Sequence, residues 1–405
     1  MQPKGLVLLL LCSIIVLLTG CWSRHELNEL SITLGLGIDK KGDRYFVSAQ
    51  VVDPSQAAAK SMGGTNRVPV TLYRSTGKSV SEALRKMTTV APRTIYLAHL
   101  RIVIFGEELA RSGIGDALDF LSRDNETRTD FYFAIARDTS AEKILSILTP
   151  LEKIPANNLY SSLQTSANYW APTHGLFLDE LLNGLAARGK SPAITGVRIL
   201  GQNKENEEEE QNSTSIVNKI KPPIELSYEG IGVLHGDRLI GWLSSDESKG
   251  YNYIQGHVKQ TLGHIECEDG GRLASDVVRA HTNLTSKIIN GAPEIFIHIS
   301  AEGNIKEVAC HVNLNDPATI PKLNKQVNAV MANLVQKAVN AAQHKFKTDF
   351  LGFGDSLRKK QPSAWAKMEK DWEKLFESVP VHIDVDYRLR RIGTITNPLQ
   401  ESVKE

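Results

Sequence analysis

Apolar residues along this chain follow two different periods, and each period predicts a different element. Between residues 381 and 389, VHIDVDYRL, every second residue is apolar, which predicts a β-strand buried on one face. Between Ile320 and Phe346, apolar residues recur at steps of three and four, which predicts a long helix packed on a sheet. The fold must therefore combine helices with strands.

The first half of the chain alternates between predicted strands and helices. Two apolar runs, Ile32–Ile38 and Tyr45–Val52, flank a glycine-containing turn and predict a β-hairpin. Residues 54–66 are rich in Ala, Ser and Gly and predict a loop. The pattern then predicts strands over 99–105 and 131–136, and helices over 79–90, 114–122, 141–148 and 176–187. This alternation indicates a mixed α and β region.

The composition changes at residues 202–215, QNKENEEEEQNSTS, which contain nothing apolar and predict a solvated linker. Beyond it, the pattern predicts a hairpin over 229–243, a strand over 295–299, a turn over 301–304 and a strand over 305–314. Trp365, Trp372 and Phe376 share one helical face, which indicates core packing more than a ligand cage.

Together these patterns predict an α+β fold, a multi-domain protein of mixed β-sheets with packed helices. We expect an N-terminal region over residues 21–200 with two subdomains and a linker over 201–223. A C-terminal α+β domain over 224–396 and a tail over 397–405 complete the expected organisation.

The N-terminus has the pattern of an exported protein. Lys4 precedes an apolar run over residues 6–18, which is shorter than the roughly 20 residues a spanning helix needs. The sequence Leu18-Thr-Gly-Cys21 then resembles a bacterial lipobox, which predicts cleavage of residues 1–20 between Gly20 and Cys21 and acylation of the Cys21 sulfur. Two acyl chains would tether the mature chain to a membrane. The alternative is an uncleaved anchor with an incidental cysteine.

Charge argues against a nucleic-acid partner. Removing residues 1–20 removes only Lys4 from the 47 lysines and arginines and leaves all 46 acidic residues, so the mature chain is formally neutral. Proteins that bind nucleic acid usually carry a basic surplus. No polybasic stretch indicates binding to anionic lipid either.

Two cysteines, Cys267 and Cys310, remain after the signal peptide and Cys21 are set aside. A histidine accompanies each, His264 and His311, so a zinc site is one alternative. Zinc sites usually have two closely spaced cysteines, which this chain lacks. A disulfide is a second alternative because exported proteins form them. We favour the third, two unlinked thiols.

No catalytic motif occurs: the sequence contains no H-E-x-x-H, G-x-S-x-G, P-loop or C-x-x-C pattern. Asp384 and Asp386 share a strand face and could form a carboxylate pair. Arg388 and Arg390 lie on the same face, which favours a solvated, ion-paired surface. We therefore expect a protein that is not an enzyme and has no catalytic residues, cofactor or metal site.

Several stretches together resemble the Ger(x)C lipoproteins, the C subunits of nutrient germinant receptors in endospore-forming bacteria. The matching stretches are Cys21-Trp22, Glu26–Leu30, Gly35–Asp39, His99–Glu107, Leu239–Leu243, Phe350–Gly354, Trp365, Trp372 and Arg390–Gly393. Taken together and in this order, these stretches span nearly the whole mature chain, although each stretch alone is weak evidence of the resemblance.

This resemblance implies a role in spore germination. It implies a receptor with an A subunit that has soluble and membrane parts, a transporter-like B subunit and this lipoprotein on the outer face of the spore inner membrane. It also implies three mixed α/β domains and no catalytic residues; only Cys21 transfers as a functional position. Direct binding of a small-molecule germinant is left open. The alternative is a solute-binding lipoprotein of a transporter, which would have two lobes around a cleft.

Overall fold

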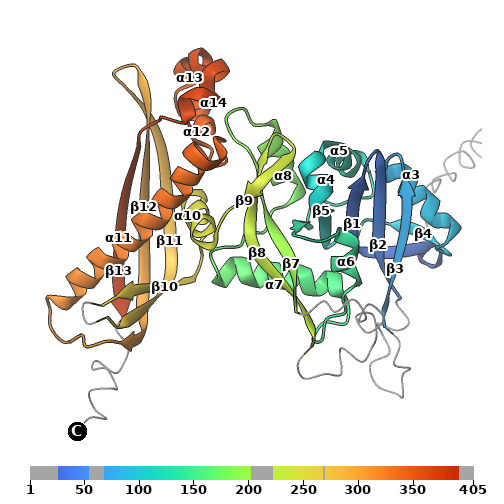
Figure 1. Cartoon of the computed structure of the whole chain (residues 1–405), viewed down its shortest axis with the longest axis horizontal. Helices are drawn as coiled ribbons and strands as arrows, with labels where there is room; N and C mark the ends of the chain where they lie inside the picture. Colours follow the sequence, from blue (N-terminus) through green and yellow to red (C-terminus); the bar gives the residue numbers. More distant parts are fainter. Residues whose placement is uncertain (1–25, 54–67, 202–221, 268–269, 392–405) are drawn as a thin grey trace, which may run out of the picture.

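The structure is a computed structural model that describes residues 26–53, 68–201, 222–267 and 270–391. Two β-sheets, each with packed helices, lie side by side along the longest axis of the molecule (Figure 1). The predicted signal peptide, Cys21, the loop over 54–66, the acidic segment and the C-terminal tail lie outside the described residues. The α+β fold class predicted from the sequence is confirmed.

The first sheet has nine strands in the order β3-β2-β1-β5-β6-β7-β8-β9, with β4 paired to β1. Pairs along β1, β5, β6 and β7 are parallel, and the outer pairs are antiparallel. The strands are β1 Leu30–Lys41, β2 Arg44–Val52, β3 Val70–Gly77, β4 Thr94–Tyr96, β5 Ile102–Gly106, β6 Tyr132–Ala136, β7 Ala193–Gly201, β8 Ile224–His235 and β9 Arg238–Trp242.

Helices cover both faces of this sheet. Strands β5 and β6 are buried along their whole length because parallel strands carry helices on both sides. One core contains apolar residues of α3, α4, α5 and α8, and the opposite core contains those of α6 and α7. These helices are α3 Val80–Lys86, α4 Glu107–Ser112, α5 Gly115–Arg123, α6 Ala141–Ser146, α7 Pro155–Tyr169 and α8 Leu178–Ala186.

The second sheet has four strands in the order β10-β11-β12-β13, and the long helix α11 lies along it (Figure 1). Ile295, Ile297 and Ile299 of β12 join Val335 and Val339 of α11 in one core. The elements are β10 Thr261–Glu266, β11 Arg272–Ile289, β12 Ala292–Ala309, β13 Val381–Arg391, α10 Ser245–Gln255, α11 Thr319–Asn340, α12 Phe353–Lys360, α13 Pro362–Met368 and α14 Trp372–Phe376. A π-helical turn, η3, continues α11 over Ala341–Phe346, and 3₁₀ turns occupy η1 Leu27–Glu29, η2 Met87–Thr89 and η4 Glu369–Asp371.

Two sequence predictions need correction. The turn predicted over residues 301–304 is absent from the described structure, because β12 continues to Ala309 and accommodates the Gly303 region through register shifts against β11. The helix predicted over 365–376 is divided into α13, η4 and α14. The helices α7 and α10 and the strand β11 were not predicted.

The predicted acidic linker has an unexpected place in the fold. It joins β7 to β8, which are neighbouring antiparallel strands of the first sheet. That sheet therefore includes strands from both sides of residues 202–221. The division into domains at this segment, and the number of domains, stay predictions.

Candidate functional site

The cysteine predictions have different outcomes. Cys21 lies outside the described residues, so its lipidation stays a prediction. A disulfide joins Cys267, just beyond β10, to Cys310, just beyond β12, and the favoured prediction of two unlinked thiols is therefore wrong. The sequence could not reveal this pairing because β11, which brings the two positions together, was itself not predicted. Among the described residues no cluster of His, Cys, Asp and Glu could hold a metal ion.

The carboxylates and arginines of β13 form the ion-paired surface that the sequence predicted. Asp384 lies 2.7 Å from Nδ1 of His298, and Arg388 lies 2.7 Å from Asp386. Arg390 pairs with Glu302 of β12 at 2.7 Å. These pairs leave Asp384 and Asp386 in an exposed network of opposite charges, not in a carboxylate pair.

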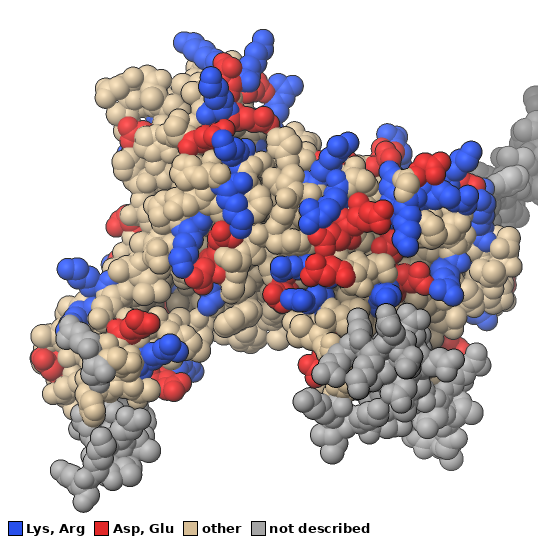
Figure 2. Space-filling view, viewed as in Figure 1, with Lys and Arg blue, Asp and Glu red and all other residues tan. Residues whose placement is uncertain are grey.

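Charges of both signs are interspersed over the surface. Figure 2 shows lysines and arginines lying beside acidic side chains across the visible face, over both sheets and over the helices α12 to α14. No helix within the described ranges is both long and apolar enough to cross a membrane.

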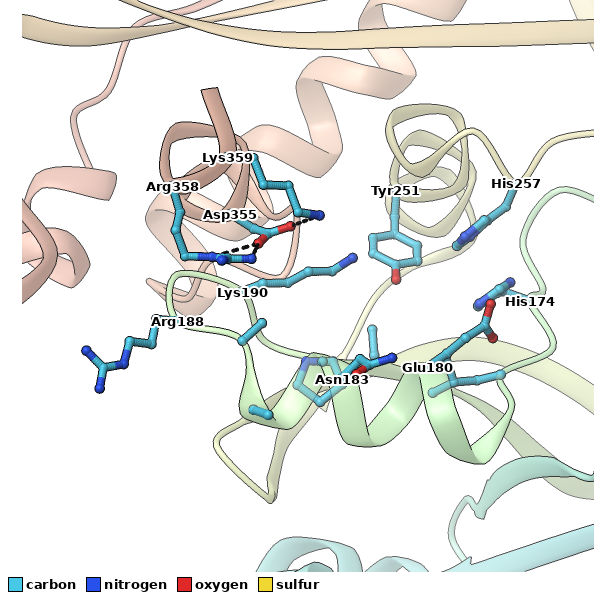
Figure 3. A pocket seen from close by; sticks show the side chains of 16 residues that line it. His174, Glu180, Asn183, Arg188, Lys190, Tyr251, His257, Asp355, Arg358 and Lys359 are labelled. Carbon is cyan, nitrogen blue, oxygen red and sulfur yellow. Dashed lines mark hydrogen bonds and ion pairs between the residues drawn. The ribbon is translucent and has the colours of Figure 1, made fainter. Parts of the chain in front are cut away.

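A cavity with a volume of about 700 Å³ lies where α8, α10 and α12 meet (Figure 3). Its walls combine α8, the segment between α8 and β7, α10 and α12. Polar lining residues from these elements include Glu180, Lys190, Tyr251, His257 and Asp355. The cavity therefore lies between helices that pack on the first sheet and helices that pack on the second.

Lys190 places an ammonium group inside this cavity. Burial lowers the pKa of Lys190, and the carboxylates of Asp355 and Asp349 only partly oppose that effect. Its Nζ donates to Oε1 of Gln255 at 3.0 Å. The Gln255 amide is oriented for this contact because its Nε2 donates to the carbonyl of Leu351 at 2.7 Å. The hydrogen-bond acceptor of the ammonium is thus a neutral oxygen.

Tyr251 places a hydroxyl group in the same cavity. Its side chain is 4% exposed, and its hydroxyl has no hydrogen-bond partner among the residues that the structure describes. Figure 3 shows the Lys190 side chain extending toward Tyr251, whose hydroxyl points toward α8. Burial, followed by the charge of Glu180, raises the pKa of Tyr251, so the hydroxyl keeps its proton at neutral pH and can donate it.

Two histidines form another wall. The rings of His174 and His257 are stacked with centroids 3.7 Å apart. Burial, then the charge of Lys190, lowers the pKa of His257 to about 4, and burial also lowers the pKa of His174 well below its usual value. Both rings are therefore neutral at pH 7. Asn252 uses its amide nitrogen for the carbonyls of Ala171 and Thr173, so its oxygen accepts from Nδ1 of His257 at 3.3 Å.

Most other charges at the cavity already have partners. Asp355 accepts from Arg358 and Lys359, each at 2.7 Å. Arg188 points away from the cavity in Figure 3 and pairs with Glu369 at 2.7 Å. Glu180 accepts from the backbone N–H of Phe177 at 3.1 Å. Lys190 thus differs from its cationic neighbours Arg188, Arg358 and Lys359, because it forms no ion pair with any residue that the structure describes.

A buried carboxylate fixes the loop that carries Lys190. Asp349 accepts from the backbone N–H groups of Gly352, Phe353 and Gly354 at 2.7 to 3.1 Å and from Nε1 of Trp372 at 3.0 Å. Its own carbonyl accepts from the N–H of Ser191 at 2.8 Å. The segment Phe350–Gly354, one of the family-like stretches in the sequence, therefore connects the helices of the second sheet to the segment that leads into β7 of the first sheet.

Two glycines make this connection close. Gly189 has φ +78°, and a Cβ there would come within 2.5 Å of Trp365 and 2.9 Å of Gly354. A Cβ on Gly354 would come within 2.6 Å of Nε1 of Trp372 and 2.8 Å of Gly189. Because no larger residue fits without displacement, the backbone of residue 190 is held against α12.

The N-terminal motif Gly35–Asp39 has a structural explanation as well. A Cβ on Gly35 would come within 2.9 Å of Leu145 and 3.1 Å of Ala156, so glycine lets α6 and α7 approach β1. Asp39 accepts from the N–H groups of Ala141 and Glu142 at 2.9 and 3.1 Å, at the start of α6. This motif positions helices and contributes no group to the cavity.

The cavity has the size of a small-molecule site, and the described residues offer it no nucleophile with an adjacent base. None of Lys190, Tyr251 and His257 was selected from the sequence. These residues come from separate stretches whose spacing carries no motif, and only the fold brings them together.

Comparisons with known proteins give a consistent result along the chain. Residues 23–199 match the family model "Spore germination protein N-terminal domain", and residues 229–393 match "Spore germination B3/GerAC like, C-terminal". The chain is 32% identical to spore germination protein KC of Bacillus subtilis (strain 168) over 412 aligned residues, covering 100% of both. It is 25% identical to spore germination protein B3 of the same organism, covering 93% of this chain and 95% of that protein.

A solved structure shares the fold. The crystal structure of the GerBC protein aligns with a TM-score of 0.53 over 88% of this chain and 96% of its own, at 20% identity. At that identity the likeness shows the fold alone. With 100% and 88% of this chain covered, the similarity in sequence to KC and the similarity in fold to GerBC both include parts of the first and second sheets.

Proposed function

Because this chain belongs to the family of B3/GerAC-like spore germination proteins, we propose that it is the C subunit of a spore nutrient germinant receptor. The observation that carries the proposal is the 32% identity to spore germination protein KC over the full length of both chains. The resemblance in the sequence motifs and the fold shared with GerBC support it.

The proposal includes a lipid anchor at Cys21. Cleavage after Gly20 would make Cys21 the first mature residue, and diacylation of its sulfur would hold the protein at the outer face of the spore inner membrane. Tethering two binding partners to one surface raises their effective concentration and favours assembly. We propose that the chain in this way assembles with the A and B receptor subunits and acts without catalysis.

The function is tested in a sporulating strain that lacks this gene. Complementation with the wild type should restore nutrient-induced germination, measured as loss of spore optical density. The Cys21→Ala variant should be released from the membrane fraction and should respond more weakly, because assembly then depends on free diffusion. Cys12→Ala is the matched control, since residue 12 lies in the apolar run that cleavage removes. A Cys21→Ala strain with full germination and full membrane retention would contradict the anchor.

The alternative of a solute-binding lipoprotein makes a different prediction. Loss of such a protein would abolish uptake of one solute and leave the germination response to other nutrients unchanged. Uptake of labelled nutrients and germination are therefore measured in the same deletion strain. Normal germination with defective uptake would overturn the receptor proposal.

A further inference from the structure

We propose that the cavity between α8, α10 and α12 is a binding site for a small organic carboxylate, held between the Lys190 ammonium and the Tyr251 hydroxyl. The site goes beyond the proposed receptor role. It concerns a ligand of this subunit itself, and nothing in the argument depends on which receptor the chain serves.

The first support is that two donors converge without bonding to each other. The Tyr251 side chain is almost fully buried, but its hydroxyl reaches the open cavity and has no hydrogen-bond partner within the described residues. The Lys190 side chain extends toward Tyr251 (Figure 3). A carboxylate has two oxygens and can accept from both donors at once. One ligand group would therefore replace water at both donors.

The second support is the charge that the fold places in the cavity. An ammonium removed from water is unfavourable unless an opposite charge compensates it. The nearby carboxylate of Asp355 is already held by Arg358 and Lys359 at 2.7 Å each. Asp349 is occupied by three backbone N–H groups and Trp372. The Glu180 carboxylate also acts on Lys190 through its charge but forms no ion pair with it among the described residues. A ligand carboxylate would supply an anion in direct contact with the ammonium.

The third support is that Lys190 is held in place before any ligand arrives. Its aliphatic stem packs on Gly352, where a Cβ would come within 3.2 Å of Lys190 Cδ. Gln255 holds the ammonium at 3.0 Å. Little side-chain freedom remains to be lost on binding, which favours affinity.

The opposite wall suggests what else the ligand carries. His257 is neutral and its Nδ1 proton is directed at Asn252, so its Nε2 is an acceptor. The Glu180 carboxylate lines the same cavity. Acceptors at this end match a hydrogen-bond donor on the ligand, such as a hydroxyl or an ammonium group. The expected class is therefore a hydroxy or amino carboxylic acid.

The test uses the full mature, lipidated protein purified in detergent. L-lactate, L-malate and L-asparagine are titrated by isothermal calorimetry, with lactamide as the uncharged counterpart of lactate. At least one acid should bind and lactamide should not. Lys190→Met keeps the stem over Gly352 and removes the charge, so it should weaken the dissociation constant of that acid about 10- to 100-fold. Tyr251→Phe should weaken it less, because a neutral hydrogen bond is lost.

Lys249→Met is the matched control. Lys249 lies on α10, and burial lowers its pKa as for Lys190, but its ammonium lies 4.5 Å from the ring of Trp170, away from the cavity lining. This variant should bind the acid as the wild type does. Thermal melting of each variant without ligand distinguishes loss of binding from loss of fold.

The inference is overturned if none of the three acids binds at 10 mM, roughly the weak end of small-ligand affinity. It is also overturned if Lys190→Met, folded as judged by its melting curve, binds as tightly as the wild type. Either result would leave the germination phenotype of the deletion strain unaffected, so the receptor proposal can stand or fail separately.

Discussion

Substituting Gly354 by Ala tests whether α12 lies as close to Gly189, in the segment that carries Lys190, as the structure shows. The new Cβ would lie 2.6 Å from Nε1 of Trp372 and 2.8 Å from Cα of Gly189. Both distances are below van der Waals contact, and one of the atoms is backbone, so a small rotation cannot relieve the overlap. The Trp372 indole must move, and its 3.0 Å hydrogen bond to Asp349 must break.

The magnitude follows from these two effects. Overpacking a dense core lowers the free energy of unfolding by about 1–3 kcal/mol. Loss of a hydrogen bond to a charged group lowers it by about 1.5–3 kcal/mol. Because residue 354 lies in α12, the higher helix propensity of Ala offsets about 1 kcal/mol of this loss in unfolding free energy. We expect a net loss of about 2–5 kcal/mol.

The assay is urea denaturation followed by tryptophan fluorescence, since Trp365 and Trp372 both report on this contact. Gly263→Ala is the control: its Cβ would meet only Ser275 O, at 3.9 Å. That variant should unfold within about 1 kcal/mol of the wild type. If Gly354→Ala is as stable as Gly263→Ala, the close contact and the positioning of Lys190 that depends on it are refuted.

Two further predictions concern buried groups. Burial raises the pKa of Asp349 from 3.8 to about 6, so its contribution to stability is fully present below pH 4 and is lost as the pH rises through 6. The advantage of the wild type over Asp349→Asn in unfolding free energy should therefore fall by about 3 kcal/mol between pH 4 and pH 7.5. A difference that does not change with pH would contradict this. The Cys267–Cys310 disulfide closes a loop with a sequence separation of 43 residues. Its reduction should lower the unfolding free energy by about 4 kcal/mol in a melt with dithiothreitol, and the double Ser variant should show no response to the reductant.

The parts of the fold that could be predicted from the sequence are those with a clear period. The alternation in residues 381–389 and the three- and four-residue steps in 320–346 correspond to β13 and α11. The period reveals them because each element buries one face and exposes the other. Helix α7, by contrast, contains mostly Asn, Ser, Gln, Ala and Tyr with few large apolar residues, and its pattern is weak.

The 18-residue strand β11 was missed for another reason. Its sequence includes polar and charged residues at many positions, and much of it is only partly buried. Its length comes from pairing with β12, which supplies seventeen aligned residue pairs. That pairing is a tertiary property and leaves no local signal.

The candidate cavity could not be predicted at all. Lys190 follows a helix end, Tyr251 lies within α10, and Asp355 begins α12, with nothing in their spacing to connect them. By contrast, the motifs that suggested the family are mostly structural: Phe350–Gly354 surrounds Asp349, and Gly35–Asp39 positions α6 and α7. Recognising a family through such motifs therefore says little about where a ligand binds.

Capture of this chain from purified spore inner membranes tests the proposed receptor role most directly. A C-terminally tagged wild-type protein is isolated in mild detergent, and the proteins that accompany it are identified by mass spectrometry, with the Cys21→Ala strain in parallel. We predict that the A and B subunits of one germinant receptor accompany the wild type and are depleted in the variant. A transporter permease and ATPase in their place, or no receptor subunits with the wild type, would contradict the account.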